Sequence, residues 1–240
     1  MNQPAPALAT LHSDKAPTLA EQAYRALKRD IMSGALNPGL ALRLEFLKQR
    51  YQLSFTPLRE ALNRLQSERL VDSEALKGFR VAPLSLKEMR DSMSARILID
   101  CEALSRSIDQ ASDDWETAIV AALHALELAT RRQHANGTSF DAYYELVESR
   151  HLALHRALIA ACDSRWLMDF STTLYMQTER YRRPMLVNLF KTLAVRDVSQ
   201  EHREIVDAAL ARDHKAATAL LAAHYNKTAQ LIENTLETLD

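Results

Sequence analysis

The stretch RLEFLKQRYQLSFTPLREALNRLQSERL, residues 43–70, has the pattern of two short helices joined by a tight turn. The second helix is predicted to begin near Pro57. The Thr56 side chain can accept the first free amide hydrogens of a helix, and proline loses nothing at the first helical position. Apolar residues then recur every three or four positions, which places them on one face. These residues are Leu58, Ala61, Leu62 and Leu65.

The opposite face of this helix carries hydrogen-bonding side chains, Thr56, Arg59 and Asn63. The preceding helix is expected at 44–51, and residues 52–54 are few enough to force a sharp crossing between the two. Spacing alone leaves two interpretations open. The pair is either an ordinary helical hairpin with a solvated face or a unit that presents these groups to base edges.

The segment that follows favours the second interpretation. Apolar residues at 70–72 and 79–81 flank a loop ending at Gly78, which can take a positive backbone angle, and this predicts a β-hairpin. Upstream, Thr18 and Glu21 form a capping box that opens a further helix. Three helices and a basic-tipped hairpin make a winged helix-turn-helix. The candidate DNA-contacting residues are Arg43, Ser54, Thr56, Arg59, Asn63, Lys77 and Gly78.

This order of residues resembles the GntR family of bacterial transcriptional regulators. The resemblance is carried by Thr-Pro-Leu-Arg-Glu-Ala-Leu at 56–62, Glu-Arg-Leu-Val at 68–71 and Gly-Phe-Arg-Val at 78–81. It implies sequence-specific binding to operator DNA. The family usually has a basic residue at the position of Phe55, so the resemblance also implies a different operator sequence here. Because one such helix reads only a few base pairs, we expect a homodimer on a palindromic operator.

Composition describes a soluble protein of one or two domains, with 240 residues, 47% hydrophobic and 25% charged. No apolar run approaches the roughly 20 residues of a membrane-spanning helix, and residues 1–16 lack signal-peptide features, so we expect a cytoplasmic protein. Cys101 and Cys162 lie in apolar helical patterns and are predicted to be buried free thiols.

The net charge of −1 conceals an uneven distribution along the chain. Residues 1–82 hold twelve Lys and Arg against eight Asp and Glu, a balance of +4, and the remainder holds 18 against 23, a balance of −5. A basic head on an acidic body fits a DNA-binding module, since phosphate attraction needs only one positive face.

The chain is predicted to divide into a disordered arm (1–16), a winged helix-turn-helix domain (17–83) and an all-helical effector-binding and dimerisation domain (84–240). After residue 84 there is one glycine, one proline and no sustained β alternation. The fold class is therefore mainly α, with a bundle of antiparallel helices, and such bundles commonly hold ligands or metals. Helices are expected at 85–108, 113–133, 139–161, 165–181, 185–193, 199–211 and 214–239. Capping boxes at Ser85 and Glu88 and at Asp113 and Glu116 open the first two of these helices.

Histidines carry the possible chemistry of the bundle. His151 and His155 stand four residues apart and so share a helix face, and His202 and His224 fall on the last two helices. Four imidazoles suit a divalent ion such as zinc or nickel. The alternative is that each histidine is separately hydrogen-bonded or partly exposed. That alternative is assigned to His124, His134 and His214.

The helical part resembles the FCD type of GntR effector domain. The resemblance implies that a helix Asp, a His four residues later and two further histidines hold a metal, which in turn holds a small carboxylic acid. His155, His202 and His224 match the family's histidines, and His151 stands where Asp is usual. This departure leaves open the choice of metal and also direct capture of an anion. Glu148, one turn earlier, is predicted to orient the His151 ring.

Two further residues are candidates for effector contact, Arg96 and Tyr181. Arg96 lies in an apolar helix stripe and can clamp a carboxylate, or it can pair with Asp100 instead. Tyr181 lies in the basic cluster at 179–183. A metal-dependent helical-bundle enzyme is the rival class of function. However, a metalloprotease helix needs Glu beside its first histidine, and this chain has Leu152. The sequence predicts a repressor, not an enzyme, that a small carboxylate releases from DNA.

Overall fold

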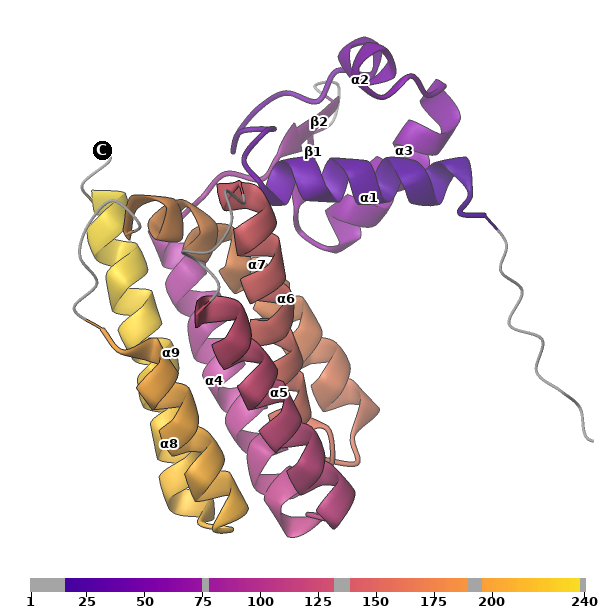
Figure 1. Cartoon of the computed structure of the whole chain (residues 1–240). Helices are drawn as coiled ribbons and strands as arrows, with labels where there is room; N and C mark the ends of the chain where they lie inside the picture. The colour runs from indigo at the N-terminus through magenta and orange to yellow at the C-terminus, as the bar shows by residue number, and fades with distance from the viewer. Residues whose placement is uncertain (1–15, 75–77, 132–138, 190–195, 238–240) are drawn as a thin grey trace, which may run out of the picture.

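The computed structural model describes residues 16–74, 78–131, 139–189 and 196–237, and this part of the chain is mainly α-helical, which confirms the predicted fold class. A small N-terminal part, built from three helices and a hairpin, adjoins an elongated bundle of helices (Figure 1). Of the predicted features, residues 1–15 of the arm, Lys77 and His134 lie outside the described residues.

The N-terminal part is a winged helix-turn-helix. Its elements are α1 (Leu19–Met32), α2 (Leu44–Tyr51), α3 (Phe55–Ser67), β1 (Val71–Glu74) and β2 (Gly78–Val81). The two strands pair antiparallel with Val71 opposite Val81, and Gly78 has the predicted positive backbone angle, with φ of 81°. Apolar residues from the helices and strands form one buried cluster. The Thr18 hydroxyl accepts from the backbone of Glu21 and caps α1 as predicted.

Helix α3 begins two residues earlier than predicted. Its N-cap is Ser54 and its first residue is Phe55, so the expected start near Pro57 is wrong. The first turn of a helix has no internal partners for its amide hydrogens, and Pro57 is therefore tolerated there. Gln52, with φ of 54°, ends α2 in the left-handed conformation. The turn between the helices is consequently tight.

The bundle contains α4 (Leu86–Asp109), α5 (Asp113–Arg131), α6 (Phe140–Ile159), α7 (Arg165–Leu189), α8 (Val198–Leu210) and α9 (His214–Glu237). The Ser85 hydroxyl accepts from the backbone of Glu88, as predicted for the start of α4. The predicted cap of α5 at Asp113 is wrong. The Ser112 hydroxyl accepts from the backbone of Trp115, so the helix begins at Asp113, one residue earlier than a cap at Asp113 would place its first residue.

Helix α7 is one continuous helix, where two helices at 165–181 and 185–193 were predicted. Pro184 removes one backbone donor and costs about 3 kcal/mol in a helix interior. Neighbouring contacts hold the preceding turn in place, since Arg182 pairs with Glu148 and Arg183 with Asp141, both on α6. Tertiary packing here outweighs the local preference.

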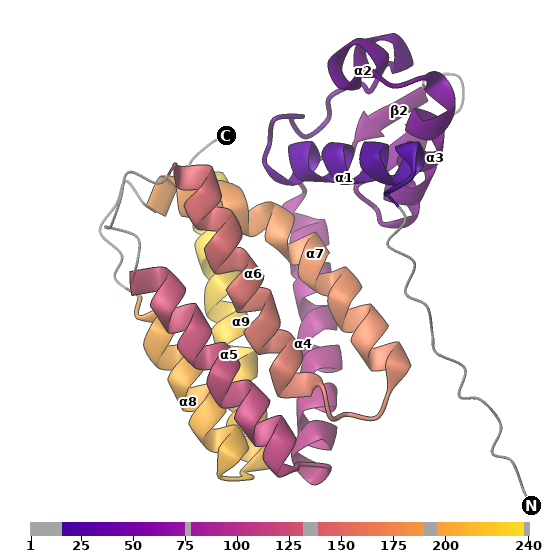
Figure 2. The ribbon, with the colours of Figure 1, turned by 45° about the vertical axis from the view of Figure 1, so that its right-hand side comes forward.

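Helix α7 also joins the bundle to the N-terminal part, and it extends toward α1 (Figure 2). The Gln177 amide donates to the backbone oxygen of Glu68, and Arg180 donates to those of Arg69 and Ala82. The carbonyls lie at the end of α3 and after β2. One helix of the bundle thus forms hydrogen bonds with the backbone on both sides of the β-hairpin.

Two smaller predictions concern the cysteines and the membrane. Cys101 and Cys162 are free thiols, but Cys101 is only half-buried. Among the described helices, none has the length and apolar character needed to cross a membrane.

Candidate metal centre and nucleic-acid interface

Four histidines meet inside the bundle, His151 and His155 from α6, His202 from α8 and His224 from α9. One ring nitrogen of each lies within 4.8 Å of the others. All but His151 are buried, and His151 is partly buried. The fold thus brings together the four residues that the sequence singled out.

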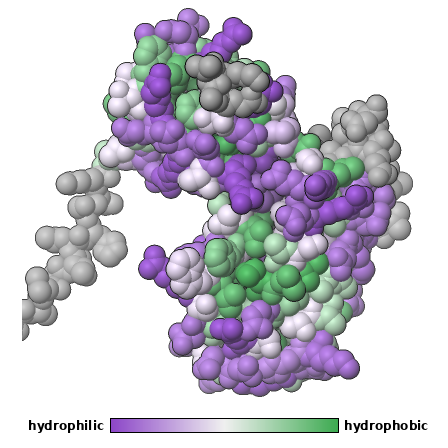
Figure 3. All heavy atoms as spheres, turned by 180° about the vertical axis from the view of Figure 1, so that it is seen from behind, coloured by the Kyte–Doolittle hydropathy of each residue, from purple (hydrophilic) through white to green (hydrophobic). Residues whose placement is uncertain are grey.

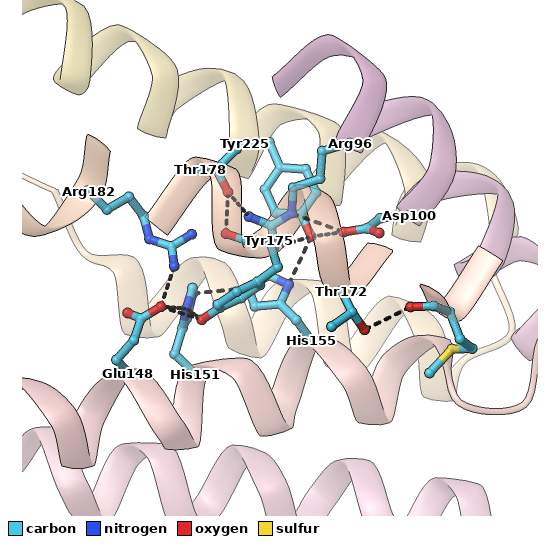
Figure 4. Close-up of polar contacts among 11 residues, drawn as sticks. Arg96, Asp100, Glu148, His151, His155, Thr172, Tyr175, Thr178, Arg182 and Tyr225 are labelled. Carbon is cyan, nitrogen blue, oxygen red and sulfur yellow. Dashed lines mark hydrogen bonds and ion pairs between the residues drawn. The ribbon is translucent and has the colours of Figure 1, made fainter. Parts of the chain in front are cut away.

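Hydrogen bonds around the cluster fix how the rings of α6 are oriented. The Nε2 atoms of His151 and His155 lie 3.0 Å apart. On its other side, His151 Nδ1 lies 2.7 Å from the Tyr175 hydroxyl, which donates to Glu148 Oε1 at 2.6 Å (Figure 4). The tyrosine proton is thus directed at the carboxylate, so the tyrosine oxygen accepts from His151 Nδ1. The lone pair of His151 Nε2 then points into the cluster.

The same logic applies to two other rings. His155 Nδ1 lies 3.0 Å from the hydroxyl of Tyr225, which donates to Asp100 Oδ2 at 2.7 Å. His224 Nδ1 lies 2.9 Å from Glu201 Oε2. In each case an oxygen outside the cluster takes the Nδ1 proton and leaves Nε2 as the electron-pair donor.

Glu148 therefore orients His151 only through Tyr175. The direct distance from Glu148 Oε1 to His151 Nδ1 is 4.0 Å, and the tyrosine hydroxyl bridges the two groups. Sequence reasoning missed Tyr175 because it lies on a different helix, with no spacing that relates it to His151.

The rings are electrically neutral donors. Burial lowers the pKa of all four imidazoles well below its usual range, and it lowers that of His224 to about 4 although Glu201 accepts from its ring. His202 Nε2 is buried and has no hydrogen-bond partner among the described residues. An orphaned nitrogen beside three converging lone pairs fits a divalent cation that prefers imidazole ligands.

A cavity of about 230 Å³ adjoins the cluster, and His151, His202 and His224 form part of its wall. Arg96 also lines it, but its guanidinium donates to Asp100 Oδ2 at 3.1 Å and to Thr178 and Tyr225. The internal ion pair, one of the two alternatives for Arg96, is thus formed.

Tyr181 is not among the residues that line this cavity. Its hydroxyl accepts from the backbone of Ser85 at 3.4 Å, at the start of α4. The prediction that it contacts an effector is therefore not supported by its position, because its side chain is packed near the junction of the two parts.

Two arginines that the sequence did not single out line the cavity, Arg182 and Arg196. Arg182 pairs with Glu148, and Arg196 pairs with Glu201. Burial disfavours the Glu201 charge, but hydrogen bonds from Arg196 and His224 hold its pKa well below its usual range. The cluster at 179–183 was a signal for Arg182, whereas Arg196 had none.

The remaining histidines lie elsewhere. His214 Nδ1 is 3.1 Å from the Ser105 hydroxyl and its Nε2 is 3.4 Å from Asp109 Oδ1, while His124 is exposed. Both fit the prediction that they belong to no ligand set.

The predicted DNA-contacting residues within the described part are all exposed. They are Arg43, Ser54, Thr56, Arg59, Asn63 and Gly78. Arg59 forms no hydrogen bond or ion pair with the residues that the structure describes, so its guanidinium is free for an external partner. Phe55 stands at the position where a basic residue is usual in the family. The Nζ atom of Lys48 lies 5.0 Å from the centre of the Phe55 ring and supplies a positive charge close to this position.

The N-terminal part is a winged helix-turn-helix with an exposed arginine on α3, and the bundle joined to it contains a cavity beside four histidines. Together these features define a DNA-binding regulator with a helical sensor domain. Family comparison agrees: the family described as "Bacterial regulatory proteins, gntR family" matches residues 19–81, and "FCD domain" matches residues 91–227. The chain belongs to the GntR family of bacterial transcriptional regulators and carries an FCD domain. Members of this family are regulators rather than enzymes.

Similar proteins carry the same class of name. The HTH-type transcriptional regulator BphR of Paraburkholderia xenovorans (strain LB400) is 36% identical over 90% of this chain and 85% of its own length. The HTH-type transcriptional repressor GlaR of Escherichia coli (strain K12) is 34% identical over 84% of this chain and 90% of its own length. The solved structure of E. coli McbR/YncC shares the fold, with a TM-score of 0.70 at 18% identity over 90% of this chain and 98% of that one.

Proposed function

We propose that this protein is a repressor whose hold on operator DNA weakens when a small carboxylate binds beside a divalent metal. In this proposal residues 17–83 read the DNA, and residues 84–240 hold the metal and the effector. The four converging histidines, with the buried and unpartnered Nε2 of His202, carry the proposal. The repressor assignment is supported by the relative GlaR, which is named a repressor.

Zinc or nickel is the proposed metal, because both favour imidazole nitrogen. The cation supplies positive charge beside the cavity, to which a carboxylate is drawn. The chain contributes neutral ligands, since His151 replaces the usual Asp, so the full charge of the ion stays available to the effector. Tyr175, Tyr225 and Glu201 hold the rings in the orientation that presents their Nε2 atoms.

A homodimer on a palindromic operator is the proposed assembly. Large apolar side chains are exposed on two adjacent helices, Leu98 on α4 (73% exposed) and Trp166 on α7 (72% exposed), and the ring centres of Phe170 and Trp166 lie 5.8 Å apart. From behind, the bundle presents a hydrophobic area (Figure 3). Apolar patches of this kind favour association with another protein surface.

Helix α7 is the proposed link between effector and DNA. Tyr175 contacts His151, Thr178 contacts Arg96, and both face the site. The same part of α7 carries Arg180, which donates hydrogen bonds to the backbone carbonyls of Arg69 and Ala82 in the N-terminal part. A shift of α7 on effector binding therefore changes how the two winged domains of a dimer are spaced.

Replacing Arg180 with alanine is expected to uncouple the two parts. The substitution removes the hydrogen bonds to Arg69 and Ala82, so the effector still binds but changes operator affinity less. Typical coupling between sites is about 1–3 kcal/mol, or roughly 5- to 150-fold in affinity, and most of that response should disappear. Operator titrations with and without effector measure it.

The control for this experiment is Arg156→Ala, which removes an exposed arginine from α6. It should leave the response intact. An unreduced response in Arg180→Ala would show that the coupling runs through other contacts.

The proposal as a whole is tested by removing the metal. Purified protein should contain about one divalent ion per chain, and light scattering should give twice the 27.1 kDa of one chain. After chelation, a panel of small carboxylates should no longer weaken operator binding, and added zinc should restore the effect. A protein that is metal-free when purified, takes up no zinc and still responds to carboxylates would instead support direct anion capture.

A further inference from the structure

We infer that the effector is a monocarboxylic acid with an apolar body, rather than a dicarboxylate. The inference rests on the proposed function and names the ligand class of the same site. It follows from three features of the cavity: its apolar wall, the pairing of its cations, and one unpartnered hydroxyl.

Away from the histidines, the surface that the cavity wall exposes is mostly apolar, and five aliphatic side chains contribute to it. They are Met93, Leu123, Leu126, Val147 and Val198. These residues come from four helices, α4, α5, α6 and α8, so they surround the space rather than cover one side. A hydrocarbon chain placed there leaves water and gains favourable free energy with each buried methylene.

The cationic side chains among the described lining residues are already neutralised. Arg96 pairs with Asp100, and Arg182 and Arg196 pair with Glu148 and Glu201. The metal can therefore receive one carboxylate, but no free cation on the described wall awaits a second.

The acidic side chain of Glu127, which also lines the cavity, offers a second carboxylate no hydrogen-bond donor. Its carboxylate already accepts from Arg203 at 2.7 Å and pairs with Arg131 at 3.3 Å. Burying an unpaired charge among apolar groups is costly. The described wall thus disfavours a dicarboxylate, because its second charge would be buried without a partner.

Tyr144 adds a specific donor. Its side chain is buried, lines the cavity and has a hydroxyl with no hydrogen-bond partner among the described residues. Native proteins seldom leave such a group unpaired. An oxygen of the bound acid supplies the missing acceptor.

The size of the cavity limits the length of the acid. A volume of about 230 Å³ has room for about eight non-hydrogen atoms, at the roughly 30 Å³ that a water molecule occupies in the liquid. Hexanoate is therefore a suitable probe. Adipate has the same number of carbons with a carboxylate at each end, octanoate matches adipate in atom count, and hexanamide replaces the carboxylate with a neutral head.

Calorimetric titration of the zinc-loaded protein with these compounds tests the inference. Hexanoate should bind at least about tenfold more tightly than adipate, and each methylene added from butanoate to hexanoate should tighten binding by about fourfold. Octanoate should still bind more tightly than adipate. Because the two acids have the same number of non-hydrogen atoms, this difference would be due to the second charge of adipate and not to its size. Tyr144→Phe should weaken hexanoate binding several-fold.

A charge placed in the wall should reverse the preference. Leu123→Arg puts a cation where the aliphatic chain lies and should favour adipate over hexanoate. The matched control is Leu128→Arg on the same helix, which is exposed and does not line the cavity, and it should retain the wild-type preference. Thermal unfolding of both variants checks that they fold.

The outcomes separate this inference from the proposed function. Adipate binding as tightly as hexanoate would overturn the monocarboxylate assignment and leave the carboxylate sensor standing. Hexanamide binding as tightly as hexanoate would overturn the carboxylate sensor itself. Binding by none of the acids would overturn both.

Discussion

Arg59→Ala is expected to abolish specific operator binding while leaving the fold and the helical domain intact. Arg59 is exposed on α3 and has no partner within the described chain, so its removal costs the folded protein little. A bidentate contact from arginine to guanine contributes about 1–3 kcal/mol of discrimination. In the proposed dimer each half-site would lose this contact, so the loss would count twice. Gel-shift titration against operator and scrambled DNA measures it.

Two controls sharpen this experiment. Arg59→Lys keeps the charge but loses the planar pair of donors, so it should retain general DNA affinity and lose sequence preference. Arg156→Ala changes the net charge by the same amount on the bundle and should leave operator binding unchanged. Unchanged affinity and sequence preference in Arg59→Ala would remove this residue from the DNA-contacting set.

The elements that sequence predicted well are those whose signals are local. The three-and-four spacing of Leu58, Leu62 and Leu65 determines the buried face of α3, and all three are fully buried. Helix caps at Thr18 and Ser85 likewise depend on residues within one turn of each other. The cap of α5 was predicted one residue too late, because Ser and Asp are both favourable cap residues and Ser112 directly precedes Asp113.

The candidate metal cluster was predictable only in part. Its four histidines stand out because few residue types bind metals, but the groups that orient them come from other helices. Tyr175 reaches His151 from 24 residues away, and Asp100 reaches His155 through Tyr225. Such contacts are created by the packing of α4, α6, α7 and α9, and no periodicity along a single helix encodes them.

Pro184 and Arg96 show how tertiary structure decides between local alternatives. Proline predicts a helix end, yet α7 continues through it because ion pairs to α6 hold the preceding turn. Arg96 had two possible partners, an effector or Asp100, and only the fold shows that Asp100, Thr178 and Tyr225 together use its donors.

His155→Ala is expected to lose the metal and the effector response together. His155 is a buried member of the cluster, with its ring held by Tyr225 and its Nε2 3.0 Å from that of His151. Loss of a group that only orients a ligand typically costs 10- to 100-fold in metal affinity, and loss of a ligand itself should cost more than about 100-fold. Elemental analysis after dialysis should find the variant nearly metal-free.

Stability and DNA binding should respond differently to this change. A ligand that binds only the folded state at a hundredfold excess over its Kd stabilises it by about 2.7 kcal/mol, so chelation should lower the Tm of the wild type and leave that of His155→Ala unchanged. Operator binding without effector should persist, because the winged domain has its own buried core. The matched control is His214→Ala, a histidine outside the cluster that contacts Ser105, which should keep the metal.

His151→Asp completes the test because it restores the ligand that the FCD family usually has. A carboxylate adds negative charge next to the cation, so the variant should retain the metal and hold it at least as tightly as the wild type. The same charge offsets part of the attraction for an incoming carboxylate, and the effector should therefore bind more weakly. Full metal occupancy in His155→Ala would exclude the four-histidine site, whereas metal loss in His155→Ala with retention in His151→Asp would identify the cluster as the ligand set.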